Sequence, residues 1–190
     1  MDNTNANISE MLSVFDCVIH ENEATYISIP ITTGLRFLDW YKREGKNAAS
    51  VEEYNDLHYK HVMLENINAS AYFIEQVRKV KSNMVIEPTK LVVKGWGQID
   101  YHNFWVGVID RFIKEAYFTS GWYLSKGCVL EFLTAKRKGI PAYDMNNHEI
   151  SIDEGCMLIE STISEYSKIG LETNFFSDIL SKLKNGIFVK

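Results

Sequence analysis

The stretch AYFTSGWYLSKGCVLEFLTAKRK, residues 116–138, runs from a short apolar segment through a glycine turn into an amphipathic segment. Residues 116–119 are of types that favour a β-strand. Gly121 marks a turn. Residues 124–138 place apolar side chains at helical spacing. This strand–turn–helix unit is the repeating element of α/β proteins with a parallel sheet.

The same alternation continues in both directions along the chain. Further strands are predicted at residues 25–29, 84–87 and 140–143, and helices at residues 36–65, 66–82, 101–113, 152–168 and 174–183. Strands that alternate with helices form a parallel sheet covered on both faces. We therefore expect an α/β fold of the Rossmann-like (flavodoxin-like) kind, with a parallel sheet of four to five strands and helices on both faces.

The composition is that of a soluble globular protein. Apolar residues make up 46% of the 190 residues and charged residues 24%, which is enough to build the core of one domain. The net charge of -5 and the lack of a basic stripe argue against duplex nucleic acid as a partner. No apolar run is long enough to span a membrane. Three widely spaced cysteines form neither a disulfide framework nor a zinc pattern, so we expect a reducing, cytoplasmic location.

The segment from Ser125 to Glu131 combines the groups of a nucleotide site. In parallel sheets, ligands bind beyond the carboxyl ends of the strands, which here selects the loops at residues 30–34, 88–97 and 120–127. Ser125 and Gly127 fall at a helix start, where free N–H groups and a hydroxyl can hold an anion. Glu131 follows about one and a half turns later and could attack a sugar C1′. The alternative reading is a helix cap followed by a solvated glutamate.

The spacing Ser-x-Gly-x-x-x-Glu at Ser125, Gly127 and Glu131 resembles the signature of nucleoside 2-deoxyribosyltransferase-like proteins. It is closest to the branch that hydrolyses nucleoside 5′-monophosphates. The resemblance implies that Ser125 contacts the 5′-phosphate and that Glu131 is the nucleophile. It implies no metal and no organic cofactor, a small-molecule nucleotide as substrate, and a homodimer or larger homo-oligomer. It covers about two-thirds of the chain.

The first loop also resembles that family. The sequence YISIPITTG at residues 26–34 matches its first strand and the loop that closes over phosphate and sugar, which implies substrate contacts by Ile29, Pro30, Ile31, Thr32 and Gly34. Ile29 stands where the family usually has glycine. Within a single domain spanning residues 1–190, residues 1–24 are then an N-terminal extension whose first eight residues we expect to be loosely held. Residues 35–65 are an insertion, a lid or a subunit contact, and residues 151–190 are C-terminal helices.

The family's second acid has no unique match in this chain. Asp110 is the first choice, at the end of the helix before the third strand, and Asp100 and Glu115 are the alternatives. Trp122 and Trp96 lie in loops and could stack on a base or ribose, or pack in the core.

Two other sets of side chains have simpler explanations than chemistry. His58, His61 and Glu65 share a helical face, but no further ligands accompany them, so we expect no metal. Cys128 is read as a small buried residue rather than a nucleophile.

These features predict an N-glycosidase that cleaves the base–sugar bond of a nucleoside 5′-monophosphate through a glutamate nucleophile. One alternative keeps the chemistry but acts on NAD or a related signalling nucleotide. Another is a nucleotide-binding sensor that has lost turnover.

Overall fold

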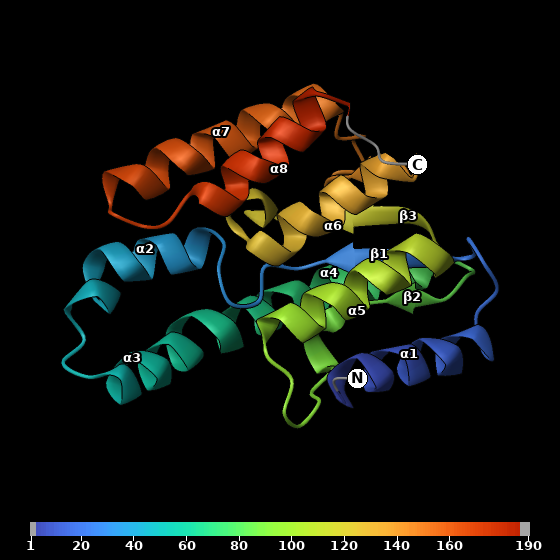
Figure 1. Cartoon of the computed structure of the whole chain (residues 1–190), viewed down its shortest axis with the longest axis horizontal. Helices are drawn as coiled ribbons and strands as arrows, with labels where there is room; N and C mark the ends of the chain where they lie inside the picture. The colour runs from blue at the N-terminus through green and yellow to red at the C-terminus, as the bar shows by residue number, and fades with distance from the viewer. Residues whose placement is uncertain (1–2, 187–190) are drawn as a thin grey trace.

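The computed structural model describes residues 3–186 and has a four-stranded sheet at its centre (Figure 1). The strands are β1 (Ala24–Ser28), β2 (Val85–Ile86), β3 (Ile113–Phe118) and β4 (Ala142–Tyr143). All neighbouring strands pair in parallel, in the order β2-β1-β3-β4. The predicted α/β fold with a parallel sheet is therefore confirmed, with four strands.

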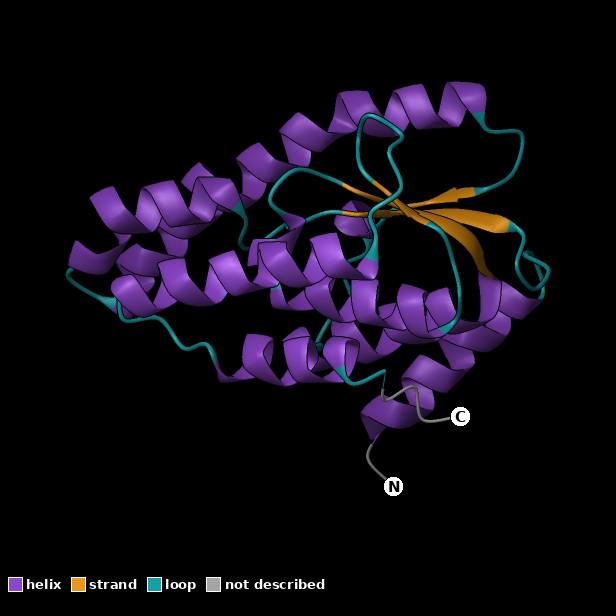
Figure 2. Cartoon of the chain, turned by 90° about the horizontal axis from the view of Figure 1, so that it is seen from above, coloured by secondary structure: helices purple, strands orange, loops and turns teal. Residues whose placement is uncertain are grey.

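Helices cover both faces of the sheet (Figure 2), which explains why all five residues of β1 are buried. Helix α4 (Leu64–Val80) covers one face, where Ile74 and Val77 pack with Ile27. Helices α5 (Gln98–Phe112) and α6 (Lys126–Arg137) cover the other face. Side chains alternate between the two faces along β1, so its neighbour Tyr26 points toward α5 and α6.

The strand order fixes where a ligand would bind. The chain leaves β1 toward β2 on one side and then returns past β1 to form β3 on the other side. From the carboxyl ends of the neighbouring strands β1 and β3, the chain leads in opposite directions, to β2 and to β4. Ligands of such sheets bind in the crevice between these two strand ends.

The connection from β1 to β2 is built of several helical segments. It contains α2 (Leu35–Arg43), a 3₁₀ turn (Gly45–Asn47), α3 (Val51–His58) and a π-helical turn (Tyr59–Met63) that continues directly into α4. The helical character predicted for residues 36–65 is therefore confirmed, but the stretch is divided into several helical segments. Ser50 explains the second start, because its side chain accepts a hydrogen bond from the backbone N–H of Glu53 and caps α3.

The N-terminal extension is ordered by packing. Helix α1 (Asn3–Asp16) lies against α5, and Ile8 and Leu12 are buried there. Gly107 of α5 makes this close approach possible, since a Cβ atom at this position would lie 2.8 Å from Leu12 Cδ1. Of the first eight residues, which were expected to be loosely held, residues 3–8 belong to α1 and Ile8 is buried, while residues 1–2 lie outside the described part.

The remaining elements complete the α5/α6 side. They are the 3₁₀ turns at Pro88–Lys90 and Trp122–Leu124, and the helices α7 (Ile152–Lys168) and α8 (Asn174–Lys184). The two C-terminal helices are therefore present as predicted, and residues 187–190 lie outside the described part. No helix between residues 3 and 186 is long and apolar enough to cross a membrane.

The contact between α6 and α7 yields a stability prediction. A Cβ atom on Gly155 of α7 would lie 2.4 Å from Phe132 Cε1, and the Phe132 ring is fully buried. We expect Gly155→Val to lower the free energy of unfolding by about 2–3 kcal/mol, because overpacking outweighs the small gain in helix propensity. Urea unfolding measures the change. Met157→Val, at an exposed position of the same helix, is the control, and equal stability of the two variants would contradict the tight contact.

Candidate active site

Glu131 is the centre of the candidate site. It lies on α6 and is only 7% exposed. Its Oε1 accepts a hydrogen bond of 2.9 Å from the Tyr26 hydroxyl, and its Oε2 accepts one of 2.6 Å from the Ser28 hydroxyl. Tyr26 and Ser28 are alternate residues of β1 and therefore point to the same face of the sheet. The carboxylate is thus fixed against the last residues of β1, beside the crevice between β1 and β3.

Burial raises the pKa of Glu131 to about 7, although the hydrogen bonds from Ser28 and Tyr26 favour the charged form and limit the rise. The carboxyl group can therefore gain or lose a proton close to neutral pH. A strongly shifted, geometrically fixed carboxyl group is typical of catalytic sites. Tyr26 is completely buried beside Glu131. Burial is the larger cause and the nearby charge of Glu131 the smaller cause that raise the pKa of the Tyr26 hydroxyl well above its ordinary value.

The start of α6 supplies the other groups of the motif. Ser125 is the N-cap residue, 7% exposed, and its side chain accepts a long hydrogen bond of 3.5 Å from the Cys128 N–H. Gly127 lies one helical turn before Glu131 on the same face. Burial and then the charge of Glu131 raise the pKa of the Cys128 thiol, which keeps it protonated and unreactive.

The first loop is held in place through its carbonyl groups. The Asn66 amide donates hydrogen bonds to the carbonyl oxygens of Pro30, Ile31 and Thr33, at 2.8, 3.1 and 2.8 Å. A ring nitrogen of His58 lies 2.7 Å from the Thr32 carbonyl oxygen. His58 of α3 and Asn66 of α4 therefore fix the shape of this loop.

Two glycines let the first loop approach the loop after β3. Gly34 and Gly121 have φ angles of +89° and +77°, which side chains other than hydrogen rarely allow. A Cβ atom on Gly121 would lie 2.9 Å from the Leu35 backbone nitrogen. The starts of α2 and of the turn into α6 consequently meet at the carboxyl edge of the sheet.

A pocket of about 410 Å³ opens at this edge. Its walls come from the two loops and from the insertion, and they include Ile29, Pro30, Arg36, Asn66, Thr119 and Ser120. Thr119 of this pocket lies beside the candidate site, since its hydroxyl donates a hydrogen bond of 3.1 Å to the carbonyl oxygen of Ser28. Ser125, Gly127 and Glu131 are not among the residues that line the pocket. Of the first-loop residues expected to touch substrate, Ile29 and Pro30 line this pocket, whereas Ile31, Thr32 and Gly34 do not.

Both tryptophans pack against other aromatic rings. Trp122 is 4% exposed, and its ring centroid lies 4.6 Å from that of Phe132. It also lines a second pocket of about 520 Å³ between the loop after β3 and the start of α7. Trp96 packs on Tyr101 and Phe104. Trp96 therefore packs against the core, whereas Trp122 packs in the core and also lines the wall of the second pocket.

None of the three acids considered as partners of Glu131 contacts it. Asp110 is half-exposed, with its Oδ1 3.3 Å from the Lys138 ammonium group. It precedes the amino end of β3, whereas Glu131 lies at the carboxyl end of β1, so the first choice for the second acid lies at the opposite edge of the sheet. Asp100 accepts a hydrogen bond of 2.7 Å from the Gly97 N–H and caps α5.

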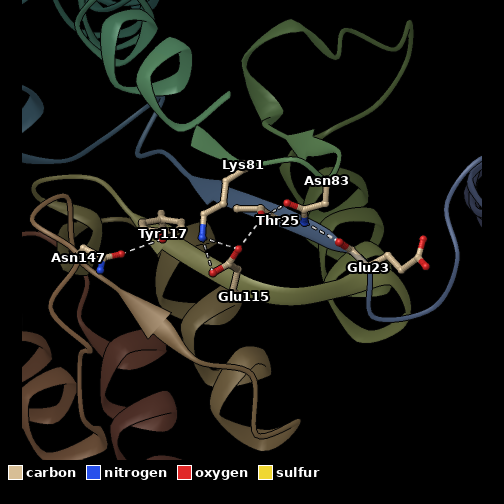
Figure 3. Close-up of polar contacts among 7 residues, drawn as sticks. All are labelled: Glu23, Thr25, Lys81, Asn83, Glu115, Tyr117 and Asn147. Carbon is tan, nitrogen blue, oxygen red and sulfur yellow. Dashed lines mark hydrogen bonds and ion pairs between the residues drawn. The ribbon is translucent and has the colours of Figure 1, made fainter. Parts of the chain in front are cut away.

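Glu115 belongs to a polar cluster on the α4 face of the sheet (Figure 3). Its carboxylate accepts hydrogen bonds from Lys81 at 2.7 Å and from Thr25 at 2.8 Å. Burial opposes the charged form of Glu115, but these hydrogen bonds and the charge of Lys81 outweigh it and lower the pKa. Glu115 therefore ties the end of α4 to β1 and β3, on the opposite face from Glu131.

Within residues 3–186, no group of three or more possible ligands could hold a metal ion. His58 is the last residue of α3, where its ring stacks on Tyr54, and His61 lies in the π-helical turn that follows.

Comparisons of the chain with protein-family models, with curated proteins and with solved structures find no match.

The hydroxyl groups that hold Glu131 yield a second prediction. Ser28→Ala removes the 2.6 Å hydrogen bond to the carboxylate, so the pKa of Glu131 should move further upward. A hydrogen bond to a charged group contributes about 1.5–3 kcal/mol, which corresponds to at least about tenfold less ionised Glu131 below pH 7. A carbon-13 NMR titration of the Glu131 carboxyl group measures this shift. Ser120→Ala, at the pocket wall, is the control, and an unchanged titration midpoint in Ser28→Ala would contradict the predicted role.

Proposed function

We propose that this protein is an N-glycosidase that cleaves the bond between base and sugar in a nucleoside 5′-monophosphate. The observation that carries the proposal is the buried Glu131 carboxylate, held by Tyr26 and Ser28 at the crevice between β1 and β3. Ligands of this sheet type bind at that crevice. A carboxylate fixed by two donors is a suitable nucleophile for a sugar C1′.

In the proposed reaction, a Glu131 oxygen attacks C1′ as the bond to the base nitrogen breaks, through an oxocarbenium-like transition state. The electron pair of that bond leaves with the base, which takes up a proton. Water then cleaves the resulting sugar ester and returns Glu131 to its ionised form. Transfer to a second base instead of water would give the same first step.

The 5′-phosphate is proposed to bind at the start of α6. Ser125 and the first N–H groups of α6 are placed there, and the positive end of the helix dipole favours an anion. The base and sugar would occupy the neighbouring pocket lined by Pro30, Thr119 and Ser120. Thr119 of that pocket donates a hydrogen bond to the carbonyl oxygen of Ser28, the residue whose hydroxyl holds Glu131.

The alternative function without turnover also has a specific observation in its favour. Asp110, Asp100 and Glu115 are all engaged elsewhere, so none of them is placed to assist Glu131. A nucleotide-binding sensor would need the pocket but not this acid.

The family resemblance also leads us to propose a homodimer or larger assembly in the cytoplasm. The aromatic face of α5 does not serve as the contact, because Phe104, Trp105 and Phe112 are buried within the chain.

The experiment that tests the function is incubation of the pure protein with a panel of substrates. The panel contains ribo- and deoxyribonucleoside 5′-monophosphates, the matching free nucleosides, and NAD. Released base is followed by chromatography. We expect release from monophosphates and at least about 100-fold less from free nucleosides, because they lack the phosphate that the start of α6 would bind. Release from NAD alone would favour the signalling-nucleotide alternative, and binding without release would favour the sensor.

A further inference from the structure

The imidazole of His102 packs against the start of α6, the helix that carries the proposed nucleophile. His102 lies in the first turns of α5, which start at the same edge of the sheet as α6. A Cβ atom on Gly127 would lie 3.2 Å from His102 Nε2 and 3.9 Å from Ser125 Oγ. The imidazole therefore packs directly against Gly127, beside the Ser125 hydroxyl, where any larger side chain at position 127 would crowd it.

Gly127 is on the same face of α6 as Glu131. The two residues are four positions apart, so their Cβ positions lie above one another on the helix, about 6 Å apart. His102 therefore packs against α6 one helical turn before Glu131, at the edge of the sheet where the nucleotide is proposed to bind. Asp110, Asp100 and Glu115 do not reach this position.

The ring is also in a suitable chemical state. His102 is half-buried, and its nitrogens make no hydrogen bond with any residue between 3 and 186. Burial, and then the charge of Lys126, lower its pKa below the ordinary value for histidine. The imidazole is therefore neutral near pH 7, and one of its nitrogens is free to accept a proton.

We propose that His102 is the general base for the second half of the reaction, an inference that rests on the proposed function. Once the base has left, the sugar C1′ is bound to a Glu131 oxygen. A water molecule attacks C1′ while His102 takes one of its protons, and the bond between C1′ and the glutamate oxygen breaks. The products are the free sugar phosphate, the Glu131 carboxylate and a protonated His102, which then returns its proton to solvent.

The test separates the two halves of the reaction in the variant His102→Gln, with His20→Gln as an exposed control. The panel substrate that the wild-type protein cleaves fastest is used. We expect the first molecule of base per protein to be released at near the wild-type rate. Steady-state turnover should then fall at least about 100-fold, the usual contribution of a general base. Mass spectrometry should detect the sugar phosphate attached to Glu131.

Azide provides an independent readout, because it is an anionic nucleophile and needs no base. Added azide should restore turnover in His102→Gln and give a sugar azide, with no gain in the wild-type protein. Gly127→Ala keeps the histidine, but the added methyl group would crowd the imidazole. It should therefore also slow turnover, and it provides a second variant in case His102→Gln does not fold.

Wild-type turnover in His102→Gln, or equal slowing of the first and later turnovers, would overturn the assignment of His102 while leaving the proposed function in place. If the wild-type protein releases no base from any substrate in the panel, both proposals fail.

Discussion

Replacing Glu131 by glutamine is expected to reduce base release by at least about 10⁴-fold, because the amide cannot form the ester with C1′. The fold should be preserved. Glutamine has nearly the same volume, and its oxygen can still accept a hydrogen bond from Tyr26 or Ser28, which hold the carboxylate at present. The measurement is the rate of base release from the best substrate, with circular dichroism to monitor the fold.

Glu115→Gln is the matched control for this loss of activity. Glu115 is also a partly buried glutamate that accepts hydrogen bonds beside β1, but it lies on the α4 face and pairs with Lys81. Its replacement should lower stability and leave the rate of base release within a few-fold of the wild type. If Glu131→Gln kept wild-type turnover, the nucleophilic mechanism would be wrong. If wild-type protein and variant both bound nucleotide without turnover, Glu131 would be a pocket residue of a sensor.

The sequence predicts the sheet well because its strands are buried on both faces. Residues 25–29 read as a continuous run suited to a strand, and the observed β1, Ala24–Ser28, is buried throughout. The start of β3 does not stand out in the sequence because Lys114 and Glu115 are charged residues of types that are uncommon in strands. Glu115 lies in the strand because Lys81, distant in sequence, neutralises it (Figure 3). Such long-range pairing leaves no local pattern to read.

The groups around Glu131 were predictable only in part. The spacing of Ser125, Gly127 and Glu131 identifies the helix start, but Tyr26 and Ser28 reach Glu131 through the packing of α6 on β1. Their alternation along the strand was the available signal. Its place in the sequence makes Asp110 the first choice for the second acid, but α5 runs so that Asp110 lies at the amino edge of the sheet, away from Glu131. The same direction brings His102, at the other end of α5, to Gly127.

The stability of the protein should carry a signature of the same carboxyl group. A folded-state pKa of about 7, against an ordinary value of 4.5, means that folding favours protonated Glu131. Its contribution to stability is therefore fully present below pH 4.5 and is lost as the pH rises through 7, a change of about 3 kcal/mol. Glutamine has no such transition.

The free energy of unfolding of Glu131→Gln minus that of the wild type should consequently increase by about 3 kcal/mol between pH 4.5 and pH 8. Urea unfolding across this range measures it, and taking the difference removes the titration of groups common to both proteins. For Glu115→Gln the same difference should stay nearly constant over this range and change mainly below pH 4.5, because the lowered pKa of Glu115 means that its ionised form stabilises the fold above that pH. A difference for Glu131→Gln that did not vary with pH would mean that Glu131 is ionised without cost. A rising difference, together with lost activity, would mean that the fold gives up stability at neutral pH to keep a reactive carboxylate at the crevice between β1 and β3.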